Sequence, residues 1–119
     1  MNTRLLVSTA FALLSVLAAC GDSGSTGGSV DCSTVKGYSE LSGAFSKCTN
    51  CHDSALTNAT DRQAAPADVN YDTYEAAKAE ATAIVDQINQ GLMPPSDQPQ
   101  LTATEKTDIL TWAQCDTPQ

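Results

Sequence analysis

Two cysteines and a histidine stand together in the run Cys48-Thr49-Asn50-Cys51-His52. This is the Cys-x-x-Cys-His pattern by which c-type haem is attached. Two thiols at this spacing can add to the two vinyl groups of one porphyrin, and the histidine that follows can place its imidazole under the iron. His52 is also the only histidine in the chain. The pattern therefore predicts one covalent haem c, with thioethers at Cys48 and Cys51 and with His52 as an axial ligand.

A second group that could bind iron lies in the run Gly91-Leu92-Met93-Pro94-Pro95. Proline cannot continue a helix, so the backbone must turn here and present the Met93 thioether from a stiff segment. A methionine in isolation more often packs into a core. However, Met93 is the only methionine apart from Met1, and no second histidine exists. We therefore predict Met93 as the sixth ligand of the iron.

The first nineteen residues read as a targeting segment. Arg4 supplies a positive charge, and the apolar run from Leu5 to Leu17 is too short to span a bilayer comfortably. The run Leu17-Ala18-Ala19-Cys20 resembles the lipobox of bacterial lipoproteins, which implies a signal peptide over residues 1–19 and acylation of Cys20. The alternative is an ordinary signal peptide cleaved near Ala19, with Cys20 left as a thiol.

Residues 20–30 are rich in Gly and Ser and predict a flexible tether behind the lipid. The folded domain is then expected over residues 31–119. Together these segments predict a location in the bacterial cell envelope, where a lipid anchor would hold the domain to a membrane facing the periplasm or the exterior.

The five cysteines divide among these roles. Cys20 is assigned to lipid and two more to haem, which leaves Cys32 and Cys115 at the two ends of the domain. Export to an oxidising compartment favours a disulfide between them. Two free thiols remain the alternative.

Composition restricts the partners. The formal charge of −8, from 6 Lys and Arg against 14 Asp and Glu, argues against nucleic acid. It indicates a redox partner with a basic docking surface if docking is electrostatic. The other interpretation is that acidic side chains only keep an exported protein soluble.

Hydrophobic periodicity predicts a first helix that leads directly into the haem motif. Its apolar face comprises Val35, Tyr38, Leu41, Phe45 and Cys48. Gly43 in this segment either lets another helix approach closely or is simply tolerated on the surface. From Asp53 to Asn70 the periodicity is lost, and an irregular loop is expected.

Two further helical segments follow. Asp72 is a candidate N-cap with Glu75 three residues later. The apolar face that follows comprises Tyr74, Ala77, Ala81, Ile84, Val85, Ile88 and Leu92, with Gly91 placed to end the helix. The sequence leaves open whether this is one helix or two shorter ones with a bend between residues 79 and 82.

The last helix is expected to start at Thr102, with Glu105 completing a capping box, and to bury Ile109, Trp112 and Ala113. Trp112 is expected to anchor this helix against the first helix and the haem edge. The competing hypothesis makes Trp112 a surface residue that relays electrons.

These features together resemble the small class I c-type cytochromes. The resemblance rests on Cys48-x-x-Cys51-His52, on Gly91 to Pro95 and on the helix from Leu101 to Trp112, and it covers about residues 32–115. It implies an all-α fold of three to five helices around one haem, with the first and last helices crossing. It also implies His52 as proximal and Met93 as distal ligand, with His52 oriented by the carbonyl of a downstream proline, of which Pro66 is the nearest.

Iron held by protein on both axes has no open position for a substrate, so the expected chemistry is outer-sphere electron transfer. We expect a carrier rather than an enzyme, with redox proteins as partners and the membrane reached through the lipid. One alternative is a haem-based binder or sensor of a small gas with a labile sixth ligand. Another is a haem-free lipoprotein that uses Cys48 and Cys51 for redox or metal chemistry. A thioredoxin-like site would need a strand-helix-strand context, and zinc would need a fourth ligand.

Overall fold

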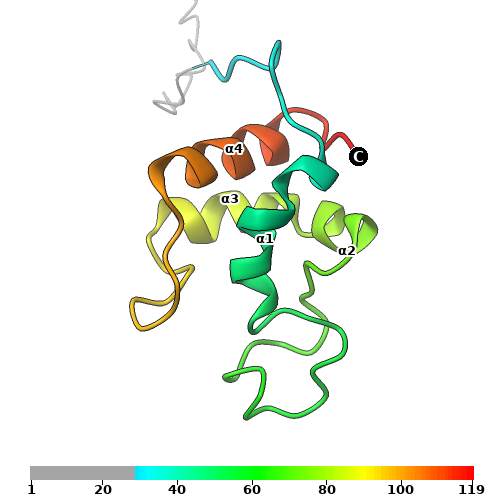
Figure 1. Ribbon diagram of the computed structural model, residues 1–119, viewed down its shortest axis with the longest axis vertical. Helices are drawn as coiled ribbons and strands as arrows, with labels where there is room; N and C mark the ends of the chain where they lie inside the picture. Colours follow the sequence, from blue (N-terminus) through cyan, green and yellow to red (C-terminus); the bar gives the residue numbers. More distant parts are fainter. Residues whose placement is uncertain (1–28) are drawn as a thin grey trace, which may run out of the picture.

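The computed structural model describes residues 29–119, and these residues form helices without any strand (Figure 1). The elements in chain order are a 3₁₀ helix, η1 (Tyr38–Leu41), followed by α1 (Ser42–Thr49), α2 (Tyr74–Ala79), α3 (Ala81–Asn89) and α4 (Ala103–Gln114). The all-α prediction is confirmed for this part of the chain. The signal peptide, Cys20 and most of the tether predicted for residues 20–30 lie outside the described residues.

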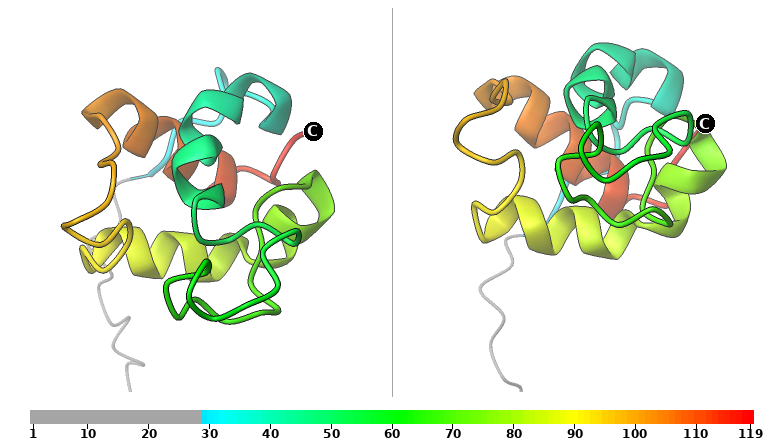
Figure 2. Two further views of the ribbon diagram at one scale, coloured as in Figure 1. Left: turned by 60° about the horizontal axis from the view of Figure 1, so that its bottom comes forward. Right: turned by 90° about the horizontal axis from the view of Figure 1, so that it is seen from below.

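The core lies where the first and last helices meet. Helix α3 packs along α4, while α1 runs across α4 and contacts it (Figures 1 and 2). Phe45 of α1 and Trp112 of α4 are both buried, and their rings meet edge to face with centroids 5.3 Å apart. Edge-to-face pairs are a favoured aromatic geometry. The prediction that Trp112 anchors the last helix against the first is confirmed.

Trp112 is fully buried, so the hypothesis of a surface electron-relay residue is wrong. Its indole Nε1–H donates to the backbone oxygen of Pro118 at 2.7 Å, which satisfies the one polar group of the ring. Because this bond reaches beyond the end of α4, it also holds the C-terminal residues against the core.

The first helix begins later than the periodicity predicts. Val35 lies outside it, and the chain first turns helical at Tyr38. Gly37 precedes that turn, and a side chain at Gly37 would collide with the backbone oxygen of Gln119. Gly37 is thus the glycine at which another part of the backbone comes too close for a side chain. Nothing lies within 4 Å of a Cβ placed on Gly43, so the hypothesis of a helix packed against Gly43 is wrong.

The second helical segment is divided in two at Glu80, where the backbone leaves helical geometry between α2 and α3. The N-cap of α2 is Thr73 rather than Asp72, since the Thr73 hydroxyl accepts from the Ala76 N–H at 3.3 Å. Asp72 instead accepts two hydrogen bonds from Ser54. Asp72 therefore ties the start of α2 to the loop that follows His52.

Helix α3 ends in a Schellman motif. Gly91 takes a left-handed conformation with φ +69°, and the N–H groups of Gly91 and Leu92 return to the carbonyls of Ile88 and Gln87. The prediction that Gly91 ends the helix is confirmed. The periodicity places Leu92 on the buried helical face, but Leu92 lies beyond the last residue of α3 and is 52% exposed.

The capping box at the start of α4 is present as predicted. The Thr102 hydroxyl accepts from the Glu105 N–H at 3.2 Å, and Glu105 Oε2 accepts from the Thr102 N–H at 2.7 Å. Ile109 of this helix is completely buried and Ala113 is half-buried.

The two ends of the described chain are tied together. Cys32 and Cys115 form a disulfide with Cα atoms 5.5 Å apart, and the Tyr38 N–H donates to the Pro118 oxygen at 2.9 Å. None of the helices in residues 29–119 has the length and apolar character needed to cross a membrane.

Candidate functional site

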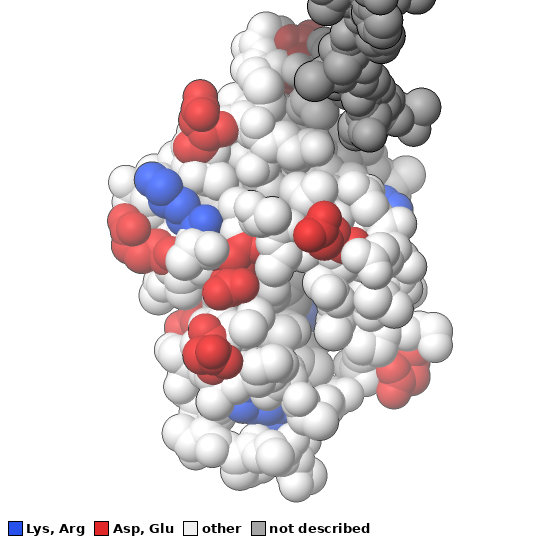
Figure 3. Space-filling model, turned by 180° about the vertical axis from the view of Figure 1, so that it is seen from behind, with Lys and Arg blue, Asp and Glu red and all other residues white. Residues whose placement is uncertain are grey.

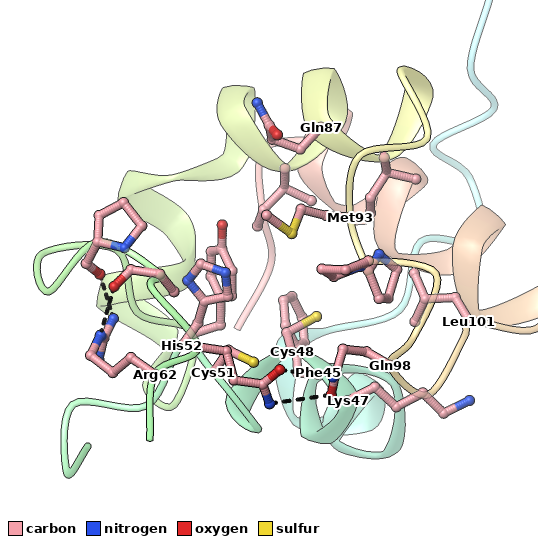
Figure 4. A pocket seen from close by; sticks show the side chains of 18 of the residues that line it. Phe45, Lys47, Cys48, Cys51, His52, Arg62, Gln87, Met93, Gln98 and Leu101 are labelled. Atoms are coloured by element: carbon pink, nitrogen blue, oxygen red, sulfur yellow. Dashed lines mark hydrogen bonds between the residues drawn. The ribbon is translucent and has the colours of Figure 1, made fainter. Parts of the chain in front are cut away.

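A cavity of about 280 Å³ opens beside α1, and it gathers the residues that the sequence singles out (Figure 4). Its walls come from α1, from the loop between α1 and α2, from α3, from the segment that leads to α4, and from α4 itself. The lining includes Phe45, Cys48, Cys51, His52, Arg62, Tyr71, Ile84, Ile88, Met93, Leu101 and Ile109. Trp112 contacts Phe45 and is not among the residues that line the cavity.

The cysteines reach the cavity because the helical turn continues past the end of α1. The N–H groups of Cys51 and His52 both return to the Cys48 carbonyl, at 3.2 and 3.0 Å. This turn directs the two thiols and the imidazole toward one cavity (Figure 4). Both thiols are free. Burial raises the pKa of Cys48 to about 11, and the neighbouring Cys51 adds to the effect, so the Cys48 thiol is neutral at physiological pH.

His52 is buried, with 7% of the residue exposed, and its ring is held in one orientation. Its Nδ1 lies 3.0 Å from the Val69 carbonyl, so Nδ1 carries the proton and Nε2 keeps the lone pair for a metal. The Tyr71 N–H donates to the His52 carbonyl at 2.8 Å, and the Tyr71 ring lies against the imidazole with centroids 4.8 Å apart. Burial lowers the pKa of His52, which favours the neutral form that binds metals.

The carbonyl that orients His52 belongs to Val69 and not to Pro66, so that assignment is wrong. The Pro66 carbonyl instead accepts from the guanidinium of Arg62. The loop between α1 and α2 is irregular as predicted, and its turns bring the carbonyl of Val69, rather than that of the proline, to Nδ1 of His52.

Met93 follows the Schellman motif, and its side chain points into the cavity beside the side chains from α3 (Figure 4). The Met93 N–H donates to the Gln87 carbonyl at 3.3 Å, and Pro94 and Pro95 line the same wall. The structure thus brings Met93 to one cavity with Cys48, Cys51 and His52, although about forty residues separate the two segments. Cys32 and Cys115 lie outside the lining.

Sequence reasoning missed two residues of the site. Arg62 is only 3% exposed, although a charged residue in a polar loop is usually on the surface. Tyr71 is buried beside His52, and burial raises its pKa to about 12. The one available signal was that Arg62 is the only arginine besides Arg4.

The donor set suits a haem c. The thiols could supply both thioether bonds. Histidine nitrogen and methionine sulfur are known axial ligands of haem iron, so His52 Nε2 and the Met93 sulfur could bind the iron. Aliphatic side chains such as Ile84, Ile88 and Leu101 form apolar walls. Comparisons of the chain with protein-family models, with curated proteins and with solved structures gave no match.

Proposed function

We propose that this protein is a monohaem c-type cytochrome that carries electrons by outer-sphere transfer. Cys48 and Cys51 would hold the haem by thioether bonds, and His52 and Met93 would bind the iron. The observation that carries the proposal is the convergence of both thiols, the only imidazole and the Met93 thioether on one cavity. The resemblance to class I cytochromes supports the same assignment.

The surrounding residues orient the two proposed iron ligands and shield the cavity from water. The Val69 carbonyl holds the His52 proton on Nδ1 and leaves Nε2 for the iron. The Schellman turn at Gly91 and the two prolines fix the backbone that presents Met93. Phe45, Ile84 and Ile88 exclude water from the interior wall. When bound, the haem supplies a one-electron iron couple. Ligation by a methionine sulfur gives this couple a higher reduction potential than ligation by two imidazoles does.

The tether and the charge complete the proposal. Acylated Cys20 would hold the carrier near a membrane of the cell envelope, and a redox partner would present a basic surface. In the view from behind, carboxylates are spread over the face rather than gathered in one patch (Figure 3). Such a spread of negative charge would attract a basic partner without defining a single docking patch on this face. Cys20→Ser should release the protein from the membrane fraction, and a soluble wild type would contradict the anchor.

Replacing the proposed sixth ligand of the iron tests whether the protein is an electron carrier. The oxidised wild type should show the weak near-infrared band of a sulfur–iron bond, and Met93→Ala should abolish it. Leu92→Ala is the matched control, because Leu92 is the exposed neighbour and does not line the cavity. A band that persists in Met93→Ala would contradict the assignment. Rapid binding of carbon monoxide to the reduced wild type would instead favour a gas binder.

A further inference from the structure

Arg62 carries a buried charge without an acidic partner. It lies in the loop between α1 and α2 and lines the cavity, with 3% of its surface exposed. The ion pairs found among residues 29–119 are Lys36–Asp108 and Lys47–Glu105, and neither involves Arg62. Because burying a charge is costly unless its hydrogen-bonding groups are satisfied, the loop must compensate the guanidinium in another way.

Oxygen atoms of the loop surround the whole guanidinium. Nε donates to Ala65, Nη1 contacts the oxygens of Asp53, Leu56 and Asn70, and Nη2 donates to Pro66 and Val69. All of these acceptors are backbone carbonyls except the Asn70 side chain. A guanidinium has five N–H groups, and these six oxygens engage all of them. Arg62 therefore has no donor left for an anionic group in the cavity, which excludes a role as an anion clamp.

One of these acceptors is also the partner of the proximal histidine. The Val69 oxygen lies 2.9 Å from Arg62 Nη2 and 3.0 Å from His52 Nδ1. A carbonyl has two lone pairs and can accept both bonds. The charged donor draws electron density toward itself, so the same oxygen becomes a weaker acceptor for the imidazole N–H.

We propose that Arg62 is a positioning residue that acts on His52 through the Val69 carbonyl and raises the reduction potential of the iron. This inference rests on the proposed cytochrome function. A strong acceptor at Nδ1 makes a histidine more basic toward its metal, and Arg62 limits that effect. A less basic His52 stabilises the ferric state less. The fixed positive charge acts in the same direction, because reduction adds one electron and removes one positive charge from the iron site.

The test compares Arg62→Met with the wild type, both carrying haem. At a fixed solution potential the ferrous-to-ferric ratio should fall about tenfold in Arg62→Met, which is a shift of about 59 mV for one electron. The His52 Nδ1–H signal in proton–nitrogen NMR should also move, because its acceptor is no longer shared. A purely structural role for Arg62 would change the unfolding midpoint and leave both of these readouts in place.

Asn70→Ala is the matched control. It removes one acceptor of Nη1, which lies 3.0 Å from Asn70 Oδ1, but leaves the bond between Arg62 and the Val69 carbonyl. It should loosen the loop and keep the wild-type potential and Nδ1–H signal.

If Arg62→Met does not accumulate in folded form, Arg62→Lys is used as the test variant instead. A lysine has three donors and cannot engage all six oxygens, so the ratio should fall about threefold.

The outcomes separate the two proposals. A wild type that carries no covalent haem overturns the proposed function. A haem-loaded Arg62→Met with the wild-type potential and an unchanged Nδ1–H signal overturns the inference alone, and so does a wild-type potential in Arg62→Lys. An Asn70→Ala variant that shifts the potential as much as Arg62→Met would also overturn it, because loop loosening would then be a sufficient cause.

Discussion

At the scale of single residues, Glu105 links the last helix to the helix that carries the haem motif. Its Oε2 accepts from Lys47 Nζ at 2.6 Å and from the Thr102 N–H at 2.7 Å. The hydrogen bond from Lys47 is the largest cause that lowers the pKa of Glu105 to about 2, from a usual value of 4.5. Helices α1 and α4 are thus joined by a charge pair as well as by the core.

This lowered pKa predicts a loss of stability in acid. A carboxylate with a lower pKa in the folded state stabilises the fold above pH 4.5, and the contribution is lost as the pH falls toward 2. Glu105→Gln should remove that part of the pH dependence and reduce stability at neutral pH. Urea unfolding between neutral pH and about pH 3 measures both effects. Parallel pH curves for the variant and the wild type would contradict the prediction.

The residues with distinctive chemistry could be identified from the sequence because the chain has so few of them. Cys48, Cys51, His52 and Met93 follow from spacing and inventory, and the structure places all four on one cavity. Arg62 and the Val69 carbonyl could not be found in that way. A backbone acceptor depends on the path of an irregular loop, and no periodicity or motif encodes that path.

At the scale of elements, two glycines should respond in opposite directions to the same substitution. Gly91 is left-handed with φ +69°, so Gly91→Ala should lower the free energy of unfolding by about 1–2 kcal/mol. Gly43 is exposed inside α1, and a Cβ at this position would meet nothing within 4 Å, so Gly43→Ala should raise it by about 0.5–1 kcal/mol. Chemical denaturation of the two variants measures the sign of each change in the free energy of unfolding. Changes of equal sign would contradict the left-handed role of Gly91 or the helical, unobstructed position of Gly43.

Two element boundaries were predictable, one from a capping box and one from a C-terminal glycine. The Thr102 and Glu105 capping box fixes the start of α4, and Gly91 fixes the end of α3. The start of the first helix depends instead on a tertiary contact, the approach of Gln119 to Gly37, which hydrophobic periodicity cannot show. The break at Glu80 likewise has no glycine or proline to mark it.

At the scale of the whole molecule, the Cys32–Cys115 disulfide closes the described domain. It links residues 83 positions apart, and on the chain-entropy model a loop of this length stabilises the fold by about 4–5 kcal/mol. The double variant Cys32→Ser and Cys115→Ser should lose much of this free energy of unfolding and keep the cavity residues in place. Urea unfolding together with the near-infrared band checks both parts. An unchanged midpoint would contradict the stabilising role.

The proposed function depends above all on covalent attachment of haem at the Cys48–His52 motif. Its most direct test is the intact mass of the denatured wild type, made in cells that attach c-type haem, compared with a Cys48→Ala and Cys51→Ala variant. The mass of the wild type should exceed that of its polypeptide by one haem, and this gain should survive denaturation and be absent from the variant. A wild type with the mass of its polypeptide alone, or a gain that persists without both thiols, would contradict it.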